Sequence, residues 1–332
     1  MRAAWYERQG PARDVLIVGE MPDPHPAAGE VRIRIAASGI NPGDVKKRQD
    51  SFGIGMPYPR VIPHSDGAGR VDQVGEGVPS HWIGRSVWCY GAQSYRPFGT
   101  AAEFTVVPLD HVALLPGGVS MDQGACLGIP GVTAHRAVHA GGDVAGRTVL
   151  VQGAGGAVGM CAAALARHAG ARVIGTVRSS AEEPAARTAG AHEVVLNDQG
   201  LVERMKTLAP ADGIDHIVEV AFGANIDADV EMLKMGGSIG AYATDNAAPK
   251  VPFWPMVFKN IRVLFLGSDD FPYGGQGGGD AGFERCASGR VGRVRNRRTD
   301  SPLRDRAGAR TDGASGAAGA GCRNSVRLSK RI

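Results

Sequence analysis

A glycine-rich segment in the middle of the chain has residue types and spacing suited to holding phosphate groups. An apolar run at 148–151 leads into a turn with a glycine at every third position, and an Ala-rich stretch follows. These glycines are Gly153, Gly156 and Gly159. In order, they permit a tight turn, a close approach of the backbone to a pyrophosphate, and close packing of a helix on the strand. Ala157 and Val158 open that helix, where free N–H groups and the helix dipole favour an anion.

The predicted ligand of this loop is a dinucleotide, and the next strand indicates which one. A strand–helix turn without a ligand is the alternative, but the strand–turn–helix context favours a binding site. An NAD site has an acidic residue at the end of the second strand. Here Thr176 lies near the end of strand 171–177, and Arg178 and Ser179 follow it with no acid before Glu182. Because a guanidinium and a hydroxyl can bind a 2′-phosphate, the sequence favours NADPH unless Arg178 is an ordinary surface residue.

The elements around the loop alternate between strand and helix patterns. Expected strands cover 148–153, 171–177, 193–197, 215–221 and 237–243, and expected helices cover 157–170, 181–191, 201–209 and 226–234. Strands that alternate with helices predict βαβ units and a doubly wound parallel sheet with helices on both faces. We therefore expect a Rossmann-type α/β domain over residues 119–272.

The amino-terminal part has a different pattern. Short strands at 31–39, 67–78, 86–91 and 101–108 are separated by Gly and Pro. The first alternates apolar and basic residues, as a half-buried strand does. These features predict a β-rich, partly closed barrel over residues 1–118.

Together these features resemble the medium-chain dehydrogenase/reductase superfamily, in its zinc-independent quinone oxidoreductase (zeta-crystallin-like) branch. Besides the glycine loop, three segments carry the resemblance: SGINPGD at 38–44, PHSDGAG at 63–69 and GIPGVTA at 128–134. The resemblance covers roughly residues 1–271. It implies a GroES-like amino-terminal domain for substrate and catalysis, and a cofactor domain after it.

The resemblance also assigns roles to individual residues. It implies that Asn41 and Thr133 position the nicotinamide and substrate, that Asn197 approaches the adenine ribose, and that Tyr242 lies near the nicotinamide. The aromatic stretch 252–270 resembles the edge strand through which such enzymes form homodimers, although ordinary core packing is an alternative for its aromatic residues.

Zinc is not expected. The zinc-dependent relatives have a Cys or His where this chain has Asn41, so one ligand of a tetrahedral site is missing. His64 occupies the second ligand position, but a hydrogen-bonded loop residue is the simpler interpretation. Of the dense Cys group that a structural zinc needs, Cys89 alone is present.

The implied reaction is transfer of a hydride from NADPH to a quinone or an α,β-unsaturated carbonyl, without zinc. A first alternative is an enoyl-thioester reductase. Those relatives have a Tyr eleven residues after the Asn, where this chain has Phe52. Other candidate proton donors are Tyr58, Tyr90, Tyr95 and His64, or solvent. A second alternative is an NADPH-binding protein that is inactive or impaired, because the family's carboxyl-terminal segment is missing.

That segment is replaced by a Gly- and Arg-rich tail over residues 273–332. Residues 274–332 hold 12 Arg and one Lys against five acids, a formal charge of +8, so the first 273 residues carry −4 of the chain's net +4. With few large apolar residues, we expect the tail to be disordered. Nucleic-acid binding is not favoured, since no aromatic residue interrupts the basic run 290–298.

The abrupt change at residue 274 suggests a reading-frame change in a GC-rich coding sequence. Out-of-frame GC-rich codons would encode such an Arg-, Gly-, Ala- and Ser-rich composition. A genuine basic tail is the alternative. Translating the DNA in the other two frames distinguishes them, because the hypothesis requires one frame to restore alternating helix and strand patterns.

Composition fits an enzyme of the cytoplasm. Of 332 residues, 43% are hydrophobic and 21% are charged, and five Cys are scattered without a CxxC pair. A disulfide framework is therefore not expected, and a reducing cytoplasm is the simpler setting. No run of 18 apolar residues occurs, so we expect no membrane partner. The expected partners are a small-molecule substrate and a second copy of the chain.

Overall fold

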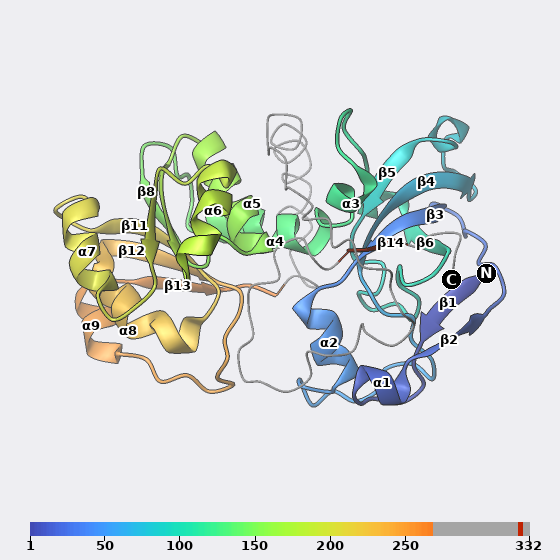
Figure 1. Ribbon diagram of the computed structural model, residues 1–332, viewed down its shortest axis with the longest axis horizontal. Coiled ribbons are helices and arrows are strands. Elements are labelled where there is room, and N and C mark those ends of the chain that lie inside the picture. Colours follow the sequence, from blue (N-terminus) through green and yellow to red (C-terminus); the bar gives the residue numbers. More distant parts are fainter. Residues whose placement is uncertain (268–324, 328–332) are drawn as a thin grey trace. The chain divides into compact units, whose positions relative to one another are not determined.

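The fold is described by a computed structural model, which covers residues 1–267 and 325–327 (Figure 1). The chain divides into two compact units: Met1–Ile129, joined by the strand at 325–327, and a second unit that begins at Pro130. Within the described residues, no helix has the length and apolar character needed to cross a bilayer.

The first unit is built from short antiparallel strands. They are β1 (Arg2–Trp5), β2 (Ile17–Glu20), β3 (Glu30–Gly39), β4 (Asp66–Val74), β5 (Ser86–Cys89), β6 (Phe104–Pro108), β7 (Val112–Leu114) and β14 (Ser325–Arg327). β1 pairs with β2, and a curled sheet has the order β14-β3-β4-β5-β7, with β6 also paired to β3. This arrangement confirms the prediction of a β-rich, partly closed barrel.

The long strand β3 shows why this sheet curls around a core. Val31, Ile33 and Ile35 alternate with Arg32 and Arg34, and the three apolar side chains are buried. Because successive side chains point to opposite faces, one face of β3 lines the core and the other carries charge. The alternation predicted from the sequence is confirmed here.

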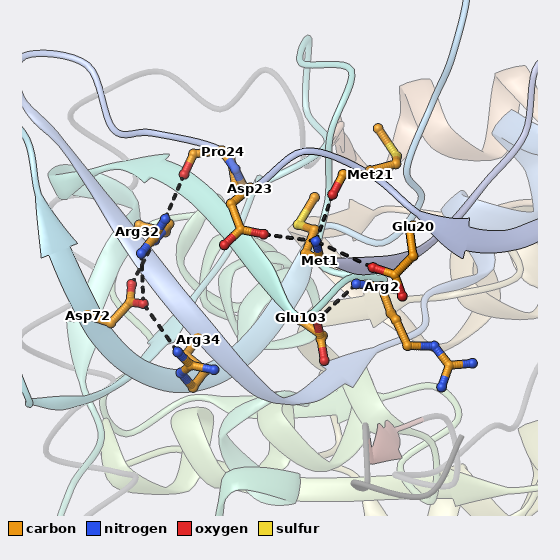
Figure 2. A network of polar contacts seen from close by, with 10 residues as sticks. All are labelled: Met1, Arg2, Glu20, Met21, Asp23, Pro24, Arg32, Arg34, Asp72 and Glu103. Atoms are coloured by element: carbon orange, nitrogen blue, oxygen red, sulfur yellow. Dashed lines mark hydrogen bonds and ion pairs between the residues drawn. The ribbon is translucent and has the colours of Figure 1, made fainter.

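Charged residues on the outer surface link neighbouring strands of the first unit (Figure 2). The Arg32 guanidinium donates two hydrogen bonds to the Asp72 carboxylate, at 3.0 and 3.1 Å, and joins β3 to β4. The amino group of Met1 donates to the Met21 carbonyl at 2.7 Å and to Asp23 at 2.8 Å. These contacts hold β1 and the chain after β2 together.

Short helices complete this unit. They are α1 (Ala12–Val15), α2 (Pro42–Arg48) and α3 (Met121–Gly124), with 3-10 turns η1 (Ser80–Trp82) and η2 (Leu109–His111). Helix α4 (Gly128–His139) then leads into the second unit.

The second unit contains a six-stranded parallel sheet. Its strands are β8 (Thr148–Val151), β9 (Arg172–Val177), β10 (Glu193–Leu196), β11 (Ile214–Glu219), β12 (Leu233–Ala241) and β13 (Arg262–Phe265). They lie in the order β10-β9-β8-β11-β12-β13, and every neighbouring pair is parallel. Numbered along the chain, this is the order 3-2-1-4-5-6 of the dinucleotide-binding Rossmann fold, which confirms the predicted fold class.

Helices connect these strands (Figure 1). They are α5 (Ala157–His168), α6 (Glu183–Ala189) after the turn η3 (Ser180–Glu182), α7 (Leu201–Leu208), α8 (Phe222–Met232) and α9 (Phe253–Phe258). α5 contacts α6, and α7 contacts α8. A core that includes Leu150, Ile174, Ile217 and Ile239 lies under these helices. The alternating pattern in the sequence predicted the order of these elements, but α8 begins at Phe222 and β12 at Leu233, four residues before the expected 226 and 237.

The stretch 252–270 is only partly the strand that the sequence suggested. Residues Phe253–Phe258 form α9, and the edge strand β13 begins at Arg262. Pro252 and Pro255 explain the difference, because proline cannot donate to a strand ladder but is tolerated in the first turn of a helix.

The predicted tail lies largely outside the described residues. Within it, Ser325–Arg327 form β14, which pairs antiparallel with Ala37–Gly39 of β3. The expectation of disorder for residues 273–324 and 328–332 concerns residues that the structure does not describe.

Candidate functional site

The glycine loop lies between β8 and α5, next to the point where the strand order reverses. Gly153 has φ of +68°, a conformation that favours glycine, and the Gly156 N–H donates to its carbonyl oxygen at 2.9 Å. Gly156 is the residue that caps α5. A Cβ built at Gly159 would lie 2.1 Å from the Gly153 carbonyl oxygen, so only glycine fits there. The tight turn at Gly153 and the close packing of the helix at Gly159 that the spacing predicts are both present.

The sequence placed Ala157 and Val158 at the start of the helix, and the structure agrees. Both lie in the first turn of α5 and are partly exposed. The first N–H groups of a helix have no partner within the helix, so this turn presents donors suited to an anion.

Buried side chains hold the loop from beneath. Thr176 of β9 accepts a hydrogen bond from the Gly153 N–H at 3.0 Å and donates to Gln152 at 2.7 Å. The Gln152 amide donates to Asp229 of α8 at 2.9 Å. The predicted site residue Thr176 therefore supports the loop from a buried position. Sequence reasoning did not identify Gln152 or Asp229, because their partners are distant along the chain.

Asp229 lies beside a second buried carboxyl group, that of Glu219 at the end of β11. Burial, reinforced by the negative charge of Glu219, raises the pKa of Asp229 well above its usual value. Burial also raises the pKa of Glu219, against the effect of hydrogen bonds from the Ala221 N–H and Asn225. Two carboxylates cannot both ionise cheaply in a dry interior. Burial and the neighbouring charge of Glu219 therefore favour the protonated form of Asp229.

The end of β9 presents the residues predicted to read the adenosine ribose. Arg178 and Ser179 directly follow the strand and are exposed, and the Asn197 N–H donates to the Val177 carbonyl at 2.8 Å. The Arg178 guanidinium forms an ion pair with Glu182 at 3.3 Å. Arg178, Ser179 and Asn197 are thus brought to one edge of the sheet, together with the Glu182 carboxylate.

Tyr242 and Thr133 also belong to the second unit. Tyr242 follows β12, and its N–H donates to the Glu219 carbonyl at 3.1 Å, next to the switch point of the sheet. Burial raises the pKa of the Tyr242 hydroxyl, so the phenol keeps its proton. Thr133 is a buried residue of α4.

Asn41 occupies a defined position in the first unit. It precedes α2, and its side-chain amide donates to Asp66 at 2.7 Å. The same Asp66 carboxylate accepts the Ile129 N–H at 2.9 Å. A Cβ at Gly128 would lie 2.2 Å from the Asp66 carboxylate, which explains the glycine. Asp66 therefore joins the three segments that carried the family resemblance, although sequence reasoning gave it no role.

His64 lies in a polar cluster near Asn41. Its Nδ1 is 2.9 Å from the Ser38 hydroxyl, which lies 2.7 Å from the Thr100 hydroxyl. Burial, with the positive charge of Arg48, lowers the pKa of His64 to about 4. A neutral imidazole at pH 7 fits the interpretation of His64 as a hydrogen-bonded loop residue.

No metal-ligand cluster is found in the parts of the chain that the structure describes. No group of three or more His, Cys, Asp or Glu side chains there could hold a metal ion. Among these residues, Cys89, Cys126 and Cys161 form no disulfide, and Cys89 is buried.

Comparison with known proteins identifies the family. Two family models match, the alcohol dehydrogenase GroES-like domain at residues 27–117 and the zinc-binding dehydrogenase at residues 157–273. The chain is 31% identical over 245 residues to the quinone oxidoreductase of Lama guanicoe, which covers 72% of each protein. The chain belongs to the quinone oxidoreductase family. The resemblance to the medium-chain dehydrogenase/reductase superfamily is thereby confirmed.

Other members of the quinone oxidoreductase family give a similar picture. The rat enzyme is 35% identical over 222 residues, 65% of either chain, so this chain spans slightly less than two thirds of that relative. The structure of Escherichia coli quinone oxidoreductase complexed with NADPH superposes with a TM-score of 0.74, at 22% identity, over 87% of this chain and 89% of that one. This last likeness concerns the fold.

Proposed function

We propose that this chain is an NADPH-dependent oxidoreductase that transfers a hydride to a quinone or an α,β-unsaturated carbonyl, without zinc. The observation that carries the proposal is the glycine loop at the switch point of a 3-2-1-4-5-6 sheet, with Arg178 at the end of the neighbouring strand. Relatives named quinone oxidoreductase support the acceptor class.

The residues present fit a dinucleotide. A Cβ built at Gly156 meets one neighbour within 4 Å, the Gly153 carbonyl oxygen at 3.3 Å, so space is open above the loop for a pyrophosphate. The first-turn N–H groups of α5 would hold that pyrophosphate, and Arg178 with Ser179 would hold a 2′-phosphate. Asn197 would approach the adenine ribose. The E. coli quinone oxidoreductase, which shares this fold, is complexed with NADPH, and that complex supports the same cofactor here.

When bound, NADPH supplies the hydride, and the protein's part is to orient the reactants and exclude water. From the family resemblance, we propose Asn41 and Thr133 as the residues that position nicotinamide and substrate, and Tyr242 as a residue near the nicotinamide. The Asp66 carboxylate accepts from the Asn41 amide nitrogen, and this bond fixes the direction in which the amide group points.

Zinc independence rests on the chemistry at Asn41. The Asn41 amide donates a hydrogen bond to Asp66 at 2.7 Å, and an amide is a poor substitute for the thiolate or imidazole that zinc prefers. Exhaustive dialysis against a chelator should therefore change neither NADPH binding nor turnover. A stoichiometric zinc content with loss of activity on dialysis would contradict this.

Turnover assays test the proposed reaction. NADPH oxidation should be followed with a benzoquinone and, in parallel, with a crotonyl thioester. We expect activity with the quinone. Activity confined to the thioester would identify an enoyl-thioester reductase instead, and NADPH binding without turnover of either would identify an impaired binding protein.

We also propose that the chain forms a homodimer through β13 and α9. Strand β13 is an edge of the parallel sheet, and large apolar side chains around it are exposed, with Phe253 at 61%, Trp254 at 63% and Phe265 at 71%. An exposed edge beside an apolar surface favours association. Light scattering should give the dimer mass, and Phe265→Glu should give the monomer.

A further inference from the structure

We propose that Glu182 is a specificity-determining residue that weakens the chain's preference for NADPH over NADH. The inference rests on the proposed dinucleotide site. Glu182 follows the end of β9 in the sequence, and the turn after the strand folds its carboxylate back onto that end.

The first observation is the position of the Glu182 carboxylate. One oxygen accepts the backbone N–H of Arg178 at 3.1 Å, and the other accepts the Arg178 guanidinium at 3.3 Å. Four residues after Arg178, Glu182 thus brings a negative charge back to the residue that follows β9. In dinucleotide-binding folds an acidic group at this strand end accepts a hydrogen bond from the ribose 2′-hydroxyl.

The second observation connects Glu182 to the phosphate loop. A Cβ built at Gly155 would lie 2.7 Å from the Cβ of Glu182, so the Glu182 stem packs against the loop. The Glu182 N–H also donates to the Ser179 carbonyl at 3.1 Å, which fixes the turn that carries it. Glu182 therefore contacts both the glycine loop and the end of β9. A dinucleotide held by the loop and by that strand end would have its adenosine ribose beside Glu182.

These contacts oppose the role of Arg178. A 2′-phosphate needs the Arg178 guanidinium, which Glu182 already neutralises, and the phosphate would also be repelled by the carboxylate. A ribose 2′-hydroxyl can instead donate to that carboxylate. The pair can still open, because Arg178 is 52% exposed and Glu182 is 28% exposed. The site should consequently accept both nucleotides, with a smaller NADPH preference than Arg178 alone would give.

Replacing the charge tests the inference. Dissociation constants for NADPH and NADH should be measured by tryptophan fluorescence in the parent and in Glu182→Gln. Freeing the Arg178 guanidinium and removing one repelling charge should together raise the NADPH/NADH affinity ratio about tenfold, with NADH binding changed by less than about threefold. The matched control is Glu183→Gln, which removes the same charge from the neighbouring ion pair with Arg187 and should leave the ratio unchanged.

The outcomes separate the two proposals. If the parent binds both nucleotides and Glu182→Gln leaves their ratio unchanged, the role of Glu182 is wrong while the site stands. If the parent binds neither nucleotide, the proposed function fails and this inference with it. Glu182→Gln in an Arg178→Ala background should give a smaller gain, since only the relief of charge repulsion remains when there is no guanidinium to free. A gain of full size without Arg178 would overturn the competition between Glu182 and the phosphate for the guanidinium.

Discussion

Substitution of Gly156 by valine separates the loop's role in binding from its role in folding. Gly156 has φ of −86° and ψ of 168°, a region that a β-branched residue adopts readily. Its new Cβ would lie 3.3 Å from the Gly153 carbonyl oxygen, which a shift of a few tenths of an ångström relieves. With the poor capping ability of valine, we expect a loss of about 1 kcal/mol and a fall in melting temperature of about 2–4 °C.

Cofactor binding should respond far more strongly, because the branched side chain of Gly156→Val fills the space that a pyrophosphate would occupy. We expect NADPH affinity to fall by roughly 100-fold or more, about 2.7 kcal/mol. Gly159→Ala should differ from Gly156→Val in lowering the stability of the fold more strongly. Its Cβ would lie 2.1 Å from the Gly153 carbonyl oxygen, so the loop itself must move, and overpacking of this kind costs about 1–3 kcal/mol.

The assay combines thermal melting followed by circular dichroism with NADPH titration of tryptophan fluorescence. Gly117→Val is the matched control, since nothing lies within 4 Å of its added Cβ and binding should be unaffected. A Gly156→Val variant that melts and titrates like the parent would refute the assignment of the loop.

Three further predictions concern ionisable side chains. Arg178→Ala should weaken NADPH binding about tenfold and leave NADH binding nearly unchanged, measured by the same titration; equal losses for both nucleotides would contradict it. Asp229 has a raised pKa, so its stabilising protonated form is lost as pH rises, and Asp229→Asn should increase the melting temperature more at pH 9 than at pH 5. Asp227→Asn, at an exposed position of the same helix, should show no such trend. His64 has its pKa lowered to about 4, so the unfolded chain binds more protons between pH 6.5 and 4, and the parent loses up to ~3 kcal/mol there. His64→Asn tolerates the φ of +75° and should lose less stability on acidification, as urea unfolding at pH 7.5 and pH 5 would show.

Local patterns predicted most of the elements and the glycine loop. The run from 148 to 159 specifies its own conformation, because strand, turn and helix signals follow one another without interruption. The alternation in β3 likewise determines which face is buried. In contrast, the family resemblance predicted a strand for the aromatic stretch 252–258, and the structure has a helix there. Pro252 and Pro255 lie at the start of that helix, where proline is tolerated.

Contacts between distant segments could not be obtained from the sequence. Gln152 and Asp229 are 77 residues apart, and Asn41 and Asp66 are 25 apart, so neither pair shares a local pattern. Each pair forms only when strands or loops are brought together by the sheet order. Glu182 was visible as the first acid after the strand end, but the turn that folds it back onto Arg178 is a property of the structure.

The acidic groups around the glycine loop share one electrostatic requirement. Carboxylates near a pyrophosphate would repel it unless each is neutralised by something other than the ligand. Asp229, held to the loop through Gln152, has a pKa raised by burial and by the charge of Glu219, which favours its neutral form. Glu182, packed against Gly155, is neutralised by Arg178 instead. A proton on a buried acid stays in place when the nucleotide binds, whereas an exposed ion pair can exchange partners. The first arrangement lowers the negative charge beneath the loop whether or not a nucleotide is bound, and the second makes the choice between nucleotides depend on which anion Arg178 prefers.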